Sequence, residues 1–125
     1  ASVPSNIETR QGNLLDAHDI QYIVHQVNCV MSSSSGSSLS GQIFSRFPHA
    51  NVYAKEHMGG RRSEPGTISV YGGDAPDSGR GVINLHAQLF PGSSKYSNDS
   101  PVNRLQWFER GLSQISQLPG LTSIA

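Results

Sequence analysis

The sequence contains little of several features that would place a protein in a particular class. Its 125 residues include a single cysteine, Cys29, which excludes an internal disulfide framework and is compatible with a reducing compartment. No stretch approaches the ~18 consecutive apolar residues of a membrane-spanning helix. The N-terminal residues 1–4 lack the basic and apolar regions of a signal peptide. We therefore expect an intracellular protein, cytoplasmic or nuclear, with no membrane partner.

Charged residues are also few, at 14% of the chain, and their formal net charge is +0. A neutral chain is not expected to bind bulk nucleic acid or an anionic membrane. A nucleotide-sized ligand held by backbone amides needs no basic surface, so neutrality does not exclude such a ligand. The five histidines have no spacing such as H-x-x-x-H, and we expect neither a metal site nor a cofactor.

The chain length fits one domain over residues 1–125. Three apolar, β-branched segments at 20–28, 67–71 and 82–85 are typical of strands. Apolar residues at helical spacing follow the first of these segments up to Pro48, and the same spacing recurs from Pro101 onward. The alternation predicts an α/β fold, with a mainly parallel mixed sheet covered by helices on both faces. Ligands of such sheets bind beyond the carboxyl ends of the strands.

The second helix is predicted from an apolar stripe and from its flanking residues. The stripe consists of Leu105, Phe108, Leu112, Ile115 and Leu118. Pro119-Gly120 then ends the helix, and 121–125 begins a further strand.

A loop of small residues joins the first strand to the first helix. Backbone N–H groups in a loop such as Gly36–Gly41 can approach an anion closely, and the start of the following helix adds a partial positive charge. The alternative is a Ser-rich surface loop without a ligand, and the local pattern leaves both readings open. The segment is neither a Walker A loop nor a dinucleotide fingerprint, because the required Lys and glycine spacing are absent.

Taken in order, these segments resemble a macro domain, the α/β module that binds ADP-ribose. The resemblance rests on Gly12–Ala17, on His25-Gln26-Val27-Asn28-Cys29 with the loop and helix up to Pro48, on Gly81–Gln88 and on Leu121–Ala125. It is closest to the branch with an H-Q-x-N-C motif. It implies a three-layer α/β/α fold whose C-terminal part, with a second phosphate loop, is missing. A second chain or segment would then complete the fold.

The resemblance also implies a set of site residues. Asn13 stands where the family often has an Asp that reads the adenine amino group, and Asn28 matches the residue that holds the distal ribose. Asn28 is also the candidate catalytic residue. The implied ligand-binding residues are Asn13, Leu14, Asn28, Gly36, Ser37, Ser38, Leu39, Ser40, Gly41, Ala87 and Gln88. Positions 37 and 38 depart from the family, which prefers Gly there.

Three functions stay open at this point. The first is binding of ADP-ribose, or of a macromolecule that carries it. The second is hydrolysis of ADP-ribosyl bonds or of ADP-ribose-1''-phosphate, for which no base is evident. Some hydrolytic relatives place a Lys nucleophile near position 88, but Gln88 cannot form a Schiff base and Lys95 is the nearest lysine beyond it. The third is a degenerate macro fold that serves as a protein-interaction module.

Overall fold

The computed structural model describes Thr9, 11–17, 19–29, 39–47, Ala50, 64–72, 80–90, Ser94 and 96–125. Within these residues the sheet consists of β1 (Tyr22–Gln26), β2 (Ile68–Tyr71) and β3 (Gly81–Leu85), in the order β1-β3-β2. β1 and β3 are parallel, whereas β2 runs antiparallel to β3. The predicted mixed α/β sheet is therefore confirmed. β1 and β2 lie inside the segments that the sequence assigned to them, and β3 begins one residue before its predicted segment 82–85.

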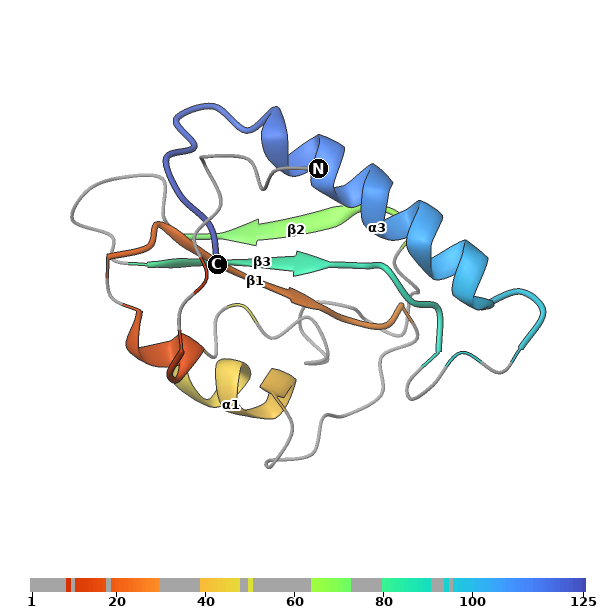
Figure 1. Ribbon diagram of the computed structural model, residues 1–125, viewed down its shortest axis with the longest axis horizontal. Coiled ribbons are helices and arrows are strands. Elements are labelled where there is room, and N and C mark those ends of the chain that lie inside the picture. Colours follow the sequence, from red (N-terminus) through yellow and green to blue (C-terminus); the bar gives the residue numbers. More distant parts are fainter. Residues whose placement is uncertain are drawn as a thin grey trace.

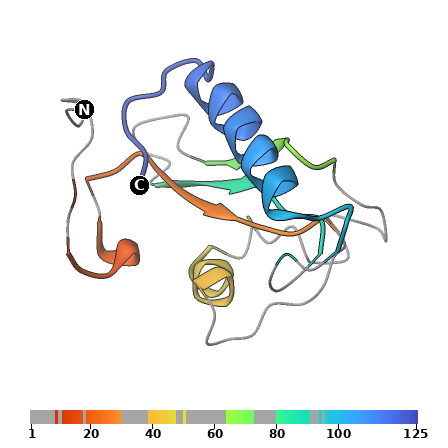
Figure 2. The ribbon, with the colours of Figure 1, turned by 45° about the vertical axis from the view of Figure 1, so that its right-hand side comes forward.

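Two helices cover opposite faces of this sheet, and the chain thus has three layers (Figures 1 and 2). α1 (Leu39–Arg46) packs on one face, together with the short 3-10 helix η1 (Leu14–Asp16), and α3 (Pro101–Ser116) lies on the other. Every residue of β3 is buried, because this strand has a neighbour on each side and a helix over each face. Among the described residues, no helix is long and apolar enough to cross a bilayer.

Alternating residues of the strands supply a separate apolar core to each layer. Between the sheet and α1, the core contains Leu15, Ile23, Val27, Ile43, Phe44 and Val82. Between the sheet and α3, it contains Tyr22, Ile83 and Ile115, with Val24, Ile68, Leu118 and Leu121 packed against them. The period-two alternation along β1 and β3 therefore divides the apolar side chains between the two faces.

α3 begins at a capping box. The Ser100 hydroxyl accepts a hydrogen bond from the backbone N–H of Asn103, and the Asn103 side chain accepts one from the backbone N–H of Ser100. Pro101 follows at the first helical position, where its missing N–H leaves no donor unpaired. The helix passes close to the sheet at Gly111, where an added Cβ would lie only 1.9 Å from Cδ1 of Leu85.

The predicted apolar stripe of α3 is only partly buried. Ile115 is 2% exposed and Leu118 packs against the core, but Leu105, Phe108 and Leu112 are 57%, 40% and 37% exposed. Only the C-terminal part of the stripe packs on the core, because the line of closest approach to the sheet runs through Gly111 and Ile115.

The C-terminal residues extend the sheet next to β1. Tyr22 N–H donates to Ser123 O at 3.2 Å, Ala125 N–H donates to Tyr22 O at 3.0 Å, and Val24 N–H donates to Ala125 O at 2.8 Å. Tyr22 and Ile124 form a parallel bridge. The start of β1, over residues 22–24, therefore has a parallel neighbour on both sides. Toward its carboxyl end, β3 is the strand that pairs with it among the described residues.

Candidate functional site

Asn28 lies two residues beyond the end of β1, where the parallel strands leave the sheet. Its neighbours continue the pairing with the segment after β3, since Val27 N–H donates to Leu85 O at 2.9 Å and Cys29 N–H donates to Leu89 O at 3.1 Å. Asn28 is 5% exposed, and Val27 and Cys29 on either side are also buried. The structure therefore places Asn28 beside the residues that follow β3.

Those residues include Ala87 and Gln88. Ala87 is fully buried, and its backbone N–H donates to Leu85 O at 2.8 Å. The side chain of Gln88 makes two internal hydrogen bonds: its Oε1 accepts from Gln26 Nε2 at 2.7 Å, and its Nε2 donates to Phe90 O at 2.9 Å. Gln88 thus ties the end of β1 to the loop after β3, in addition to any contact that it makes with a ligand.

The segment predicted as a phosphate loop is described only at its end. Gly36, Ser37 and Ser38 lie outside the described residues, whereas Leu39, Ser40 and Gly41 form the first turn of α1. The first N–H groups of a helix have no partner within the helix, which makes this turn a favourable place for an anion. Leu39 is 52% exposed and Ser40 is half-buried, so the turn reaches the surface.

A chain of buried polar groups runs from this turn across the sheet. The Oγ of Ser40 lies 3.1 Å from Nδ1 of His25, and Nε2 of His25 lies 2.5 Å from Oδ1 of Asn84. The Nδ2 of Asn84 donates to Ala50 O at 2.9 Å. Burial is the main reason that the pKa of His25 falls to about 4, although the hydrogen bond to Asn84 opposes the change and the nearby His86 adds to it. At neutral pH the ring is therefore uncharged.

His86 is a second buried histidine at the end of β3. Its Nε2 lies 2.8 Å from the Oγ of Ser69 on β2, and it is 1% exposed. Burial lowers the pKa of His86, and the neighbouring backbone of Asn28 opposes this change. No well-formed hydrogen bond joins Nδ1 of His86 to any residue that the structure describes.

An ion pair fixes the loop between β3 and α3. Asp99 is completely buried and accepts hydrogen bonds from Nε and Nη2 of Arg104 at 2.9 and 2.8 Å. The backbone N–H of Phe90 donates to the same carboxylate at 2.9 Å, and Arg104 also donates to Phe90 O at 3.2 Å. Burial by itself raises the pKa of Asp99, but these donors and the backbone of Leu89 lower the pKa below its usual range. The segment beside Asn28 is thus anchored to the first turn of α3.

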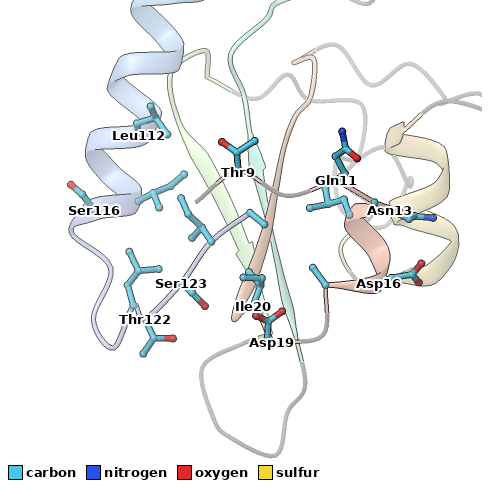
Figure 3. Close-up of a pocket in the computed structure, with 17 residues that line it drawn as sticks. Thr9, Gln11, Asn13, Asp16, Asp19, Ile20, Leu112, Ser116, Thr122 and Ser123 are labelled. Atoms are coloured by element: carbon cyan, nitrogen blue, oxygen red, sulfur yellow. The ribbon is translucent and has the colours of Figure 1, made fainter. Parts of the chain in front are cut away.

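Asn13 and Leu14 belong to a different region, a broad hollow of about 1160 Å³. In Figure 3, Leu112 and Ser116 of α3 line one side of the hollow, and Asn13 and Asp16 line the opposite side. The Oδ1 of Asn13 accepts a hydrogen bond from Leu15 N–H at 3.0 Å, which caps η1, and the side chain itself is exposed. Asp16 and Asp19 are the charged residues among those that line the hollow. Such a lining suits an uncharged polar group better than a phosphate.

The predicted site residues therefore fall into two groups. The first group lies around the carboxyl ends of β1 and β3 and consists of Asn28, Ala87, Gln88 and the first turn of α1. The second group, Asn13 and Leu14, lines the hollow. The described lining of the hollow includes no residue of the first group. His25, Asn84 and Asp99 were not predicted as site residues. The sequence signal for His25 and Asn84 was a polar residue within an apolar strand segment. The signal for Asp99 was a carboxylate just before the start of a helix. Within the described residues, no group of three or more His, Cys, Asp or Glu is placed to hold a metal ion.

Two solved structures share this arrangement of helices and strands. The macrodomain of Mycobacterium tuberculosis DarG matches with a TM-score of 0.55 and 20% identity, covering 85% of this chain and 62% of that one. The macrodomain of Thermus aquaticus DarG matches with a TM-score of 0.53 and 18% identity, covering 91% of this chain and 93% of that one. The chain has the macrodomain fold. No protein-family profile matches the sequence, and no curated protein is detectably similar to it.

Proposed function

We propose that this macrodomain binds ADP-ribose, or a macromolecule that carries ADP-ribose. The observation that carries the proposal is the position of Asn28, which is buried beyond the carboxyl end of β1, beside the loop after β3. His25, three residues earlier, contacts the first turn of α1 through Ser40. An amide at this place can donate to and accept from ribose hydroxyls. The first turn of α1, with the preceding residues 36–38, would bind the diphosphate through backbone N–H groups.

The adenine would lie toward the hollow that Asn13 and Leu14 line. The hollow presents carboxylates and no basic residue among its described lining, which opposes a phosphate there but not a neutral base. Asn13 is exposed, and its amide has hydrogen-bonding capacity left after it caps η1. This assignment orders the ligand with its base at η1 and its distal ribose at Asn28.

Binding is favoured over hydrolysis because polar side chains near Asn28 are engaged in internal hydrogen bonds or an ion pair. Hydrolysis needs a positioned base or nucleophile. Both polar ends of Gln88 are engaged internally, and the carboxylate of Asp99 is buried against Arg104. An assay for release of ADP-ribose from modified protein or DNA, and for phosphate from ADP-ribose-1''-phosphate, would reveal activity that these residues do not explain.

Titration calorimetry with ADP-ribose tests the proposal directly. We expect measurable binding by the wild-type chain and a loss of about tenfold in Asn28→Ala, since a buried polar contact to a ligand contributes roughly 1–1.5 kcal/mol. Gln106→Ala removes an exposed amide from α3 and serves as the matched control. No heat at millimolar ADP-ribose, with the fold intact, would instead favour an interaction module.

A further inference from the structure

The buried chain of hydrogen bonds through His25 joins four separate parts of the fold. It starts at Ser40 in the first turn of α1, passes through His25 on β1 and Asn84 on β3, and ends at the backbone carbonyl of Ala50. Both side chains at the centre of the chain are buried, since His25 and Asn84 are 5% and 0% exposed. Buried polar groups of this kind are costly unless all are satisfied, so their placement restricts the geometry around them.

The direction of each hydrogen bond follows from the last one. Because the amide nitrogen of Asn84 donates to Ala50 O, its oxygen is the atom that faces His25. Nε2 of His25 must then carry the proton, which leaves Nδ1 as an acceptor in a neutral ring. Ser40 therefore donates its hydroxyl hydrogen to Nδ1, and this hydrogen is not available to a ligand.

His25 also contacts α1 at a second point. The ring of Phe44 packs edge-on against the imidazole, with centroids 5.1 Å apart and planes at 72°. Ser40 and Phe44 are four residues apart, so they lie on the same side of α1, one turn from each other. Two contacts on successive turns fix both the position and the direction of the helix relative to β1. Asn28 follows His25 by three residues, just beyond the end of this strand.

We infer that His25 is a positioning residue for ligand binding. Through its hydrogen bond with Ser40, His25 sets the first turn of α1 at the correct distance from Asn28. This inference rests on the proposed function. It assigns to Ser40 an indirect role, in which its backbone lies near the diphosphate while its hydroxyl is bound to His25. Sites whose supporting side chains are locked in place bind more tightly than sites held loosely.

A double-mutant cycle with ADP-ribose separates positioning from direct contact. We expect Ser40→Ala and His25→Phe each to weaken binding about three- to tenfold, and the double variant to be no weaker than the worse single variant. Ser40→Thr keeps the hydroxyl and should retain most of the affinity. Ser45→Ala makes the same change at an exposed position of α1 and should have no effect. Losses that multiply in the double variant, or unchanged affinity in both single variants, would overturn the inference.

Two measurements test the same contact without a ligand. Nitrogen-15 NMR of the histidine ring should show the Nε2–H form of His25, and the opposite tautomer would refute the assigned directions. Amide hydrogen exchange at residues 43–46, whose N–H groups bond to the carbonyls of the first turn of α1, should be at least about tenfold faster in Ser40→Ala than in Ser45→Ala. If the wild-type chain does not bind ADP-ribose, the proposed function fails, and equal exchange in these two variants would independently reject the role of His25.

Discussion

Arg104 donates two hydrogen bonds to the fully buried carboxylate of Asp99, from the first turn of α3 to the residue just before its cap. Since the same carboxylate accepts from Phe90 N–H, the pair joins α3 to the loop that follows β3. The loop in turn contacts the strand-end region, through Leu89 O and Cys29 N–H. A single ion pair thus links the helix on one face of the sheet to the segment beside Asn28.

Asp99→Asn should therefore destabilise the protein by about 3 kcal/mol, because it leaves a largely buried guanidinium without its counter-charge. Denaturant unfolding at neutral pH measures this change. Asp16→Asn is the control, because Asp16 lies 4.0 Å from Arg46 in an exposed pair and should cost less than about 0.5 kcal/mol. Similar losses in the two variants would show that the burial of Asp99 is unimportant.

Gly111→Ala should also destabilise the fold, although alanine is the better helix former. The added methyl group would overlap Cδ1 of Leu85, which is 1% exposed and has little room to move. Overpacking costs about 1–3 kcal/mol, against about 1 kcal/mol gained in helix propensity, so we expect a net loss. Ser113→Ala, on the exposed side of α3, should leave stability unchanged or slightly higher by the same measurement. A stabilised Gly111→Ala would mean that α3 can move away from the sheet.

Stability should fall as the pH is lowered from about 6.5 to about 4. The folded state keeps His25 neutral down to a pKa of about 4, whereas the unfolded chain binds this proton at its ordinary pKa of 6.5. The unfolded state thus holds more protons in this window, and His25 alone contributes a loss of about 3 kcal/mol across it. The lowered pKa of His86 acts in the same direction, and that of Asp99 acts only below its ordinary value of 3.8.

Chemical unfolding of the wild type and of His25→Phe at several pH values checks this dependence. The variant lacks the titrating ring and should show a distinctly shallower decrease over the same range. Parallel curves for the two proteins would show that other groups control the acid sensitivity.

Asn13→Asp should strengthen binding of ADP-ribose if adenine lies at η1. A carboxylate accepts a hydrogen bond from the exocyclic amino group more strongly than an amide does, and it can still cap η1. We expect a gain of about three- to tenfold by calorimetry. Inosine-diphosphate-ribose carries an oxygen at this place, so its affinity should not increase. An equal gain for both ligands would place the base elsewhere.

The sequence by itself determined the local elements and their order. Periodicity and capping residues predicted β1, α1, β3 and the start of α3 at Pro101, because these patterns depend on residues close together in the chain. The order of strand and helix around Asn28 followed from the same reasoning. The role of Asn28 toward a ligand stays a prediction.

Only the tertiary structure decided which distant groups meet. The antiparallel placement of β2, the contact between His25 and Asn84 across 59 positions, and the internal hydrogen bonds of Gln88 all depend on strand register, which no local pattern specifies. Local sequence also did not specify which face of α3 packs on the sheet, because the apolar stripe and Gly111 favour different faces. The backbone approached most closely at Gly111, since a residue without a side chain permits contact with Leu85 that Phe108 or Leu112 would prevent.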